Sequence, residues 1–230
     1  MDTIRVKGDL QYHMYFGIDK NEKALADRVP LIEAAAKELT AGLPIDLKIV
    51  YHDGLKCLSQ MYNAVAAAAL ADNNDYLMIL NDDLLMTDGW SQSALLALRQ
   101  NPLMRDFGLA GPYEYFDGLN RRGCTQYPMV SRVHFEIMGS LCDEERFCAY
   151  GLDESLCDMY IPFDSCFYIS DMDLLNHVGL DGKAALGRRY AIKPEWHEAL
   201  YKARPYWKAK VQAYLDEHKR KKAAAKAAKV

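Results

Sequence analysis

Strand-like and helix-like segments alternate through the first half of this sequence, and this alternation constrains the fold more than any other feature. The strand-like segments are short apolar runs at residues 12–18, 47–51, 76–80 and 107–111. The helix-like segments carry apolar side chains at helical spacing and occupy residues 22–40, 57–71 and 90–100. Short buried strands joined by helices are typical of βαβ units and a parallel sheet. The sequence therefore predicts an α/β fold.

The second half is less regular, but its main elements can still be predicted. They are strands at residues 129–137 and 166–169, a helical segment within residues 143–159, and a long helix at residues 194–222. Residues 223–230 form an alanine- and lysine-rich tail, which we expect to be frayed helix or disorder. We expect residues 1–222 to form a single domain.

The charge of the chain is unevenly distributed. Its net charge is −4, and six positive charges lie between residues 219 and 229, which leaves −10 on the rest of the chain. An acidic body argues against a dedicated nucleic-acid binder, because such a protein gathers basic charge on one face. We interpret the basic run as a solvated end, with weak electrostatic contact to acidic lipid or nucleic acid as the alternative.

The cysteines and the apolar segments indicate in which cellular compartment the protein is expected to be found. None of the six cysteines forms a CxxC pair, and no cysteine–histidine spacing fits a zinc site. A chain of 230 residues does not need disulfides to build a core, so we expect mostly buried or free thiols in a reducing compartment. No segment has the apolar region of a signal peptide or the length of a membrane span. The sequence therefore predicts a soluble, cytoplasmic protein without a transmembrane segment.

The apolar run at residues 76–80 ends abruptly in Asn81, Asp82 and Asp83. The carboxyl ends of strands form the edge at which α/β proteins bind ligands. Clustered oxygen ligands suit Mg²⁺ or Mn²⁺, and these ions are commonly bound together with phosphate groups. The sequence therefore predicts a metal site here, with an ordinary Asp/Asn turn as the alternative.

Several common nucleotide-binding and catalytic motifs are absent from the sequence. It contains no GxGxxG, no GxxxxGK[ST] and no GxSxG. Their absence removes the usual dinucleotide-binding, P-loop and serine-hydrolase interpretations. The candidates that remain are carboxylates and histidines at strand ends.

Residues 80–90, LNDDLLMTDGW, resemble the metal-binding strand end of GT-A-type glycosyltransferases. Those enzymes carry an L-N-x-D or D-x-D step followed by a tryptophan. The resemblance implies that Asn81 faces the nucleotide ribose, that Asp82 supports the site, and that Asp83 ligates Mn²⁺ or Mg²⁺ between two phosphates. It also implies a GT-A-like three-layer sandwich, in which helices flank a mostly parallel central sheet.

A second block, from His134 to residue 160, is similar to eukaryotic and algal-virus members of this superfamily. There, an acceptor-side strand reading H-x-E-I-x-G precedes an acidic pair that opens a helix. The resemblance implies that His134 and Glu136 line the acceptor side. It also implies that Asp153, or as second choice Glu154, acts as the general base of an inverting enzyme. Acidic residues at a helix start are also favoured by the helix dipole alone.

Further positions match the family less specifically. His177 resembles a late histidine that acts as an additional metal ligand or phosphate contact, although a surface histidine is the simpler interpretation. Asp19, at the end of the first strand, resembles the residue that meets the nucleoside base, and we expect Asn63 to face the same side. Gly111, in a G-P step, resembles the residue that shapes the floor of the donor pocket.

The resemblance covers residues 12–195 and departs from the family pattern at the start. Family members begin with an apolar strand and a nucleotide-holding loop ahead of the strand matched by residues 12–18. Only about ten residues precede that strand here, so we expect the usual first strand to be missing or reduced to residues 4–6.

The resemblance implies a metal-dependent glycosyltransferase that moves a sugar from a nucleotide-diphosphate donor to a hydroxyl acceptor, which could be a glycan, a protein or a small molecule. Because of the shortened start, the alternative is a catalytically inactive sugar-nucleotide-binding module. A metal-dependent hydrolase or nucleotidyltransferase is a more remote third reading. The sequence leaves open the donor sugar and base, the stereochemical outcome and the oligomeric state.

Overall fold

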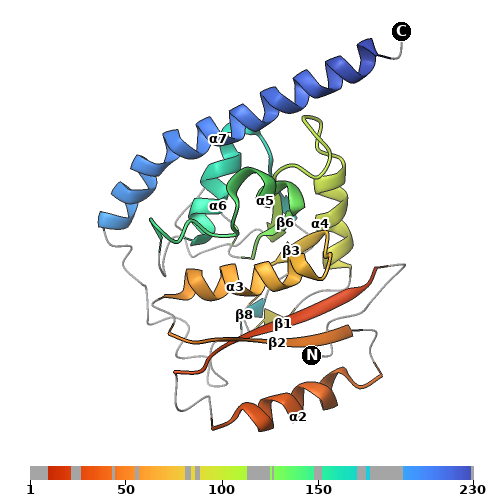
Figure 1. The fold of residues 1–230 in the computed structure, drawn as a ribbon, viewed down its shortest axis with the longest axis vertical. Coiled ribbons are helices and arrows are strands. Elements are labelled where there is room, and N and C mark those ends of the chain that lie inside the picture. The colour runs from red at the N-terminus through yellow and green to blue at the C-terminus, as the bar shows by residue number, and fades with distance from the viewer. Residues whose placement is uncertain are drawn as a thin grey trace.

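The computed structural model describes residues 10–21, 27–42, 45–54, 57–80, 84–85, 89–112, 125, 127–147, 152–169, 175–176 and 194–228. The described helices and strands form an α/β arrangement, as the sequence predicts (Figure 1). The first strand among the described residues is β1 (Tyr12–Asp19). Residues 4–6, where a remnant of an earlier strand was expected, lie outside the described residues.

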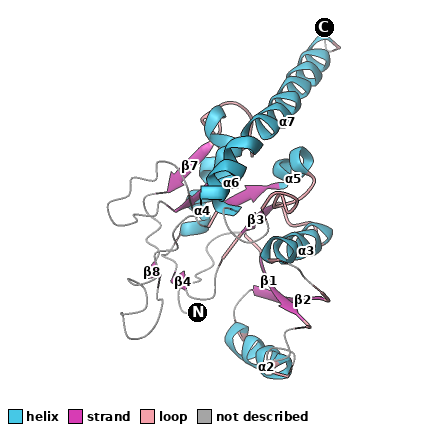
Figure 2. Ribbon diagram, turned by 90° about the vertical axis from the view of Figure 1, so that its left-hand side faces the viewer, coloured by secondary structure: helices cyan, strands magenta, loops and turns pink. Residues whose placement is uncertain are grey.

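The first half of the chain forms a small three-layer unit. Strand β1 pairs in parallel with β2 (Ile45–His52), and helices α2 (Val29–Thr40) and α3 (Leu58–Ala71) lie on opposite sides of the pair (Figures 1 and 2). Helix α3 approaches β1 closely at Gly17, where an added Cβ atom would lie 2.3 Å from the Met61 sulfur. A larger residue there would force the Met61 and Val65 side chains to shift, so helix–strand packing rather than backbone conformation favours glycine.

A second sheet has the strand order β3-β6-β5-β7. Its strands are β3 (Tyr76–Met78), β6 (Met129–Ser131), β5 (Leu109–Pro112) and β7 (Cys166–Ile169). Strands β5 and β7 run parallel, but β6 runs antiparallel to both of its neighbours. The central sheet is therefore mixed: β3, β5 and β7 run in one direction and β6 in the other, so the expectation of a mostly parallel sheet is met only in part. Apolar runs indicate that strands exist but carry no information on their direction.

The predicted strand at residues 129–137 is only partly correct. Strand β6 ends at Ser131, and the chain turns at once into helix α5 (Arg132–Met138). The Ser131 hydroxyl accepts a hydrogen bond from the Val133 backbone N–H, and Gly139 ends the helix with a φ of 84°. Serine at the first cap and glycine at the last are the residues that favour a short helix over a continuing strand.

Two helices and a short bridge complete the body of the protein. Helix α4 (Trp90–Arg99) packs against β5 and β7, with Ala94 and Leu98 fully buried. Helix α6 (Leu152–Tyr160) lies within the predicted helical segment and continues into the 3-10 turn Ile161–Phe163. The two-residue strands β4 (Leu84–Leu85) and β8 (Leu175–Asn176) pair antiparallel.

The long predicted helix is observed as α7 (Pro194–Ala227), which also includes most of the alanine- and lysine-rich tail. Its buried side chains recur every three or four residues and face α5 and α6; they are Leu200, Ala203, Trp207, Val211 and Leu215. Beyond Leu215 the helix leaves the body of the protein (Figures 1 and 2). No helix among the described residues is long and apolar enough to cross a membrane.

The cysteines only partly follow the sequence-based expectation. Cys142, Cys157 and Cys166 are reduced thiols that form no disulfide. A hydrogen bond with Cys157, together with burial, raises the pKa of the Cys166 thiol. Cys57, however, is disulfide-bonded, and its partner lies outside the described residues. Cys57 is therefore an exception to the expectation of mostly buried or free thiols.

A buried carboxylate fastens α7 to the loop that follows α5. One oxygen of Asp143 accepts hydrogen bonds from the Trp207 indole N–H at 2.9 Å and from Arg146 at 2.7 Å. The Arg146 guanidinium also lies 4.3 Å from the centre of the Tyr206 ring. Trp207 is fully buried and Asp143 nearly so, and charge-assisted hydrogen bonds in such surroundings are strong.

We expect Asp143→Ala to lower the free energy of unfolding by about 2–3 kcal/mol, because a buried indole N–H and a guanidinium lose their acceptor. Asp143→Asn, which keeps one acceptor oxygen, should cost less. Urea denaturation measures both, with the exposed neighbour changed in Glu145→Ala as the matched control. Equal stabilities for Asp143→Ala and Glu145→Ala would contradict this assignment.

Candidate functional site

Four predicted site residues, Asn81, Asp82, Asp83 and His177, lie outside the described residues. Among the residues that the structure does describe, no three His, Cys, Asp or Glu side chains are grouped so that they could hold a metal ion. Leu84 and Asn176, the neighbours of Asp83 and His177 in the chain, are among the described residues.

Those neighbours are paired with each other. In the β4–β8 bridge Leu84 is the partner of Asn176. Leu84 directly follows Asp83 in the sequence, and Asn176 directly precedes His177. The two strands therefore bring together segments more than 90 residues apart in sequence, at the positions that flank the two predicted metal ligands.

Asp19 lies at the carboxyl end of β1, where the sequence predicts the edge of a ligand site. It is the register partner of His52 at the end of β2, and its Oδ1 accepts a hydrogen bond from the Asn21 backbone N–H at 2.9 Å. The Lys20 backbone N–H donates to the His52 carbonyl, which closes this end of the pair. The Nδ1 atom of His52 is buried and has no hydrogen-bond partner among the described residues.

Asp153 and Glu154 occupy the first turn of α6 and are both partly buried. Burial raises the pKa of the Asp153 carboxyl group, and the neighbouring Glu154 raises it further through a hydrogen bond and charge repulsion. Tyr62 on α3 lies nearby: burial, then Cys142 and Asp153, raise the pKa of its hydroxyl. Asp153 is thus a carboxylate whose surroundings favour proton uptake, which is the property of a general base.

The structure does not bring His134 and Glu136 to the same surface. The expected strand would have placed them on one face, whereas on helix α5 residues two apart point in nearly opposite directions. The Glu136 carboxylate, on the exposed side, accepts a hydrogen bond from the Tyr214 hydroxyl of α7. The predicted strand that would have placed both on one face is therefore wrong, and the acceptor-side role of His134 and Glu136 stays a prediction.

His134 instead holds α5 against α6 and against the loop that follows α5. Its side chain is 1% exposed, its Nδ1 lies 2.8 Å from the Tyr160 hydroxyl, and its Nε2 lies 3.0 Å from the Leu141 carbonyl. Burial lowers the pKa of the imidazole to about 4, so the ring is neutral at physiological pH. Both ring nitrogens already have partners within the protein.

Gly111 is fully buried in β5. A Cβ atom there would lie 2.5 Å from the Thr125 hydroxyl oxygen and 2.7 Å from the Tyr127 carbonyl oxygen. Close packing of the neighbouring chain therefore explains the absence of a side chain at this position.

Asn63 has a role that the sequence analysis missed. Its side-chain amide donates to the Cys142 carbonyl at 3.0 Å and to Glu144 at 2.9 Å, and its oxygen accepts from the Cys142 N–H at 2.8 Å. Ser59, one turn earlier on α3, donates to the Phe147 carbonyl. The available signal was the group of polar residues, Ser59 and Asn63 among them, at the start of an alanine-rich helix, but a sequence cannot reveal partners about 80 residues away.

A groove of about 480 Å³ opens beside Asn63 and the loop that it binds. Its walls come from α3, α5, the loop after α5 and α7. Acidic Glu144 and Glu145 lie on its lining together with basic Arg146 and Lys210. This mixed lining favours no single ligand charge.

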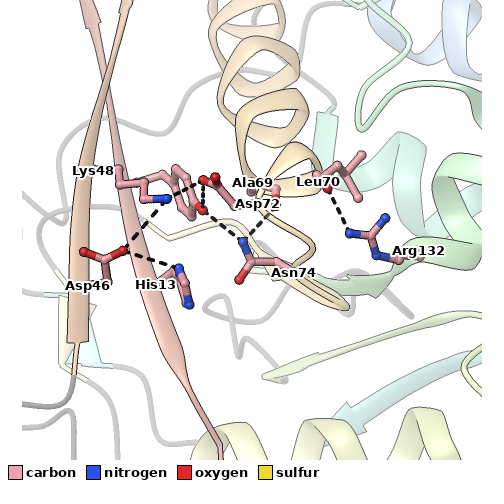
Figure 3. A network of polar contacts seen from close by, with 9 residues as sticks. His13, Asp46, Lys48, Ala69, Leu70, Asp72, Asn74 and Arg132 are labelled. Carbon is pink, nitrogen blue, oxygen red and sulfur yellow. Dashed lines mark hydrogen bonds and ion pairs between the residues drawn. The ribbon is translucent and has the colours of Figure 1, made fainter.

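A polar network ties the opposite, amino-terminal end of the β1–β2 pair to α3 (Figure 3). Its side chains are His13, Tyr15, Asp46, Lys48, Asp72 and Asn74. Lys48 and Asp72 form an ion pair at 2.7 Å, which lowers the pKa of the Asp72 carboxyl group, and Tyr15 donates to Asp72 at 2.7 Å. Tyr15, Lys48, Asp72 and Asn74 are bonded to one another far from Asp19, whereas the buried Nδ1 atom of His13 lies 3.7 Å from Asp46 and has no hydrogen-bond partner among the described residues. We interpret the network as structural.

The fold and the described side chains define an open α/β protein with a mixed sheet and a carboxylate-bearing helix start. Comparisons with protein-family models, with curated proteins and with solved structures find no match. The resemblance to GT-A-type glycosyltransferases therefore stays a prediction.

Because the folded-state pKa of Asp153 is raised, its contribution to stability is largest below the ordinary carboxyl pKa of about 4 and is lost as pH rises through the folded-state value. We therefore expect Asp153→Asn to raise the free energy of unfolding at pH 8 by about 1–2 kcal/mol, with a smaller gain at pH 4. Chemical denaturation at the two pH values measures this difference.

Asp158→Asn is the matched control on the same helix. The Asp158 carboxylate accepts two hydrogen bonds from Arg204, at 2.8 and 3.0 Å, so its loss should destabilise the protein. A stability difference for Asp153→Asn that does not change between the two pH values would show that the pKa of Asp153 is not raised.

Proposed function

We propose that this protein is a metal-dependent glycosyltransferase that moves a sugar from a nucleotide-diphosphate donor to a hydroxyl acceptor. The observation that carries the proposal is the β4–β8 bridge, in which Leu84 pairs with Asn176. The sequence analysis assigns Asp83 and His177 as metal ligands, and the bridge joins the residues bonded to them. A fold in which these two segments were far apart would have contradicted the assignment.

The residues proposed for the donor follow or end strands in the sequence. Asn81 and Asp83 follow β3, and Asp19 ends β1. Asp83 and His177 would hold Mn²⁺ or Mg²⁺, Asn81 would contact the ribose, and Asp19 the nucleoside base. When bound, the cation would neutralise the charge that develops on the departing diphosphate.

Asp153 supplies the proposed acid–base chemistry. The acceptor hydroxyl must lose its proton as its oxygen attacks the anomeric carbon, and a carboxylate within hydrogen-bond reach can accept that proton. A base is most effective when its pKa lies near the working pH, and the partial burial of Asp153 raises its pKa in that direction. Glu154 is the second choice for the base, and as the neighbour of Asp153 it helps to keep the pKa of the Asp153 carboxyl group raised.

Calorimetric titration with UDP and GDP, with and without Mn²⁺, tests the donor site. We expect Mn²⁺-dependent nucleotide binding that Asp83→Ala and His177→Ala each weaken by at least about 10- to 100-fold, the loss seen even for groups that only support a metal ligand. Asp75→Ala is the matched control, because the exposed Asp75 lies just before the opposite end of β3. Equal binding by Asp83→Ala and Asp75→Ala would overturn the metal assignment.

We expect Asp153→Asn to retain metal-dependent nucleotide binding but to lose sugar transfer and donor hydrolysis by about 100-fold or more, the contribution of a positioned base. In the unmodified protein the rate should rise with pH through a pKa above the ordinary carboxyl value, because Asp153 must lose its proton. Product formation from UDP- and GDP-sugars between pH 5 and 9 measures both effects. Nucleotide binding without turnover in the unmodified protein would favour the inactive sugar-nucleotide-binding module.

A further inference from the structure

The part of α7 beyond Leu215 does not pack against the protein core. Every residue from 216 to 228 is exposed, whereas Val211 and Leu215 on the preceding turns are buried. This segment, the projecting helix, extends away from the rest of the molecule (Figures 1 and 2). Its thirteen residues correspond to about 20 Å of helix.

The projecting helix is strongly basic and lacks large apolar side chains. Its cations are Lys219, Arg220, Lys221, Lys222 and Lys226, and its other residues after position 218 are alanines. The two acidic residues near its start are already engaged: Glu217 pairs with Lys221 at 2.7 Å, and Asp216 accepts from Gln212 at 2.9 Å.

Three of the lysines share one face. Lys219, Lys222 and Lys226 are three and four residues apart, and this spacing aligns side chains along a helix. The helix dipole favours cations only within about the last turn, which contains Lys226 but not Lys219 or Lys222. Stabilisation of the helix end therefore does not account for the whole stripe.

We propose that the projecting helix is a docking surface for an anionic phospholipid membrane. Clusters of four to eight lysine and arginine residues bind membranes that contain acidic lipids, and this helix carries five such residues. Because no large apolar side chain is present to enter the hydrocarbon, attachment is electrostatic, reversible and sensitive to salt.

The composition of the helix fits a lipid surface better than a nucleic acid. Apart from His218 it has no aromatic side chain to stack on bases, and it has no asparagine or glutamine to read base edges. Sequence-independent attraction to phosphate headgroups is what this surface can provide.

The length of the projecting helix also separates its positive charge from the acidic body. Charges in physiological salt are screened over about 8 Å, whereas the projecting helix is about 20 Å long. The outer lysines therefore lie more than one screening length from the body, so their attraction to an anionic surface is little opposed by its negative charge.

Co-sedimentation of the full chain with vesicles tests the proposal. We expect binding to mixed phosphatidylcholine–phosphatidylserine vesicles at about 0.15 M NaCl, loss of that binding near 1 M NaCl where the screening length falls to about 3 Å, and no binding to pure phosphatidylcholine. The variant Lys219→Gln/Lys222→Gln/Lys226→Gln should bind about 100-fold more weakly, since each lysine contributes about fivefold.

A matched variant removes the same charge elsewhere. Lys37, Lys202 and Lys208 are exposed and lie on α2 or on the docked part of α7. Lys37→Gln/Lys202→Gln/Lys208→Gln should bind like the unmodified protein, and circular dichroism should show similar helix content in both variants. Equal weakening by the two variants, no preference for acidic lipid, or tighter binding to a DNA duplex at the same salt concentration would each overturn the proposal.

Discussion

The position of helix α3 is the constraint on which the rest of the structure depends. The β1–β2 pair shares no ladder hydrogen bond with the four-stranded sheet in the described part of the chain, so α3 joins them. On one side it packs closely against β1 at Gly17, where a Cβ atom would displace the Met61 side chain. On another side Asn63 binds the backbone of Cys142, in the loop between α5 and α6. That loop also carries Asp143, which anchors α7. Helix α3 therefore holds the β1–β2 pair in place relative to the α5–α6 loop and α7.

The partial burial of Asp153 links the stability of α6 to its proposed chemistry. Burial and the neighbouring Glu154 disfavour the charged carboxylate, which raises its pKa and costs folding free energy at neutral pH. An exposed aspartate at a helix start would stabilise the helix dipole without this cost. The helix therefore begins with an acidic pair whose second member makes the first a stronger base, and a purely structural helix start would not require that arrangement.

The sequence predicted elements well where one pattern dominated. The apolar spacing in residues 57–71 and 90–100 gave α3 and α4 almost to their ends, because each buries a single stripe of side chains. It failed where local and long-range signals competed: the apolar residues after Met129 suggested a strand, but the caps at Ser131 and Gly139 determined a helix. The direction of β6 was also not predictable, because it is defined relative to β3 and β5, and the sequence does not show which strands pair. The hydrogen bonds of Asn63 are made with residues about 80 positions away, and no local pattern encodes such contacts.

Helix α7 connects the two proposed activities physically. Its docked part packs on α6, the helix that begins with Asp153 and Glu154, through a stripe of buried side chains centred on Trp207. Its outer part carries the lysine stripe on the same continuous helix. A membrane that held Lys219, Lys222 and Lys226 would therefore also set the orientation of α6 relative to the lipid surface. Because the Asp143–Trp207 contact fixes α7 against the loop between α5 and α6, this orientation would be transmitted by rigid packing and would not require a conformational change.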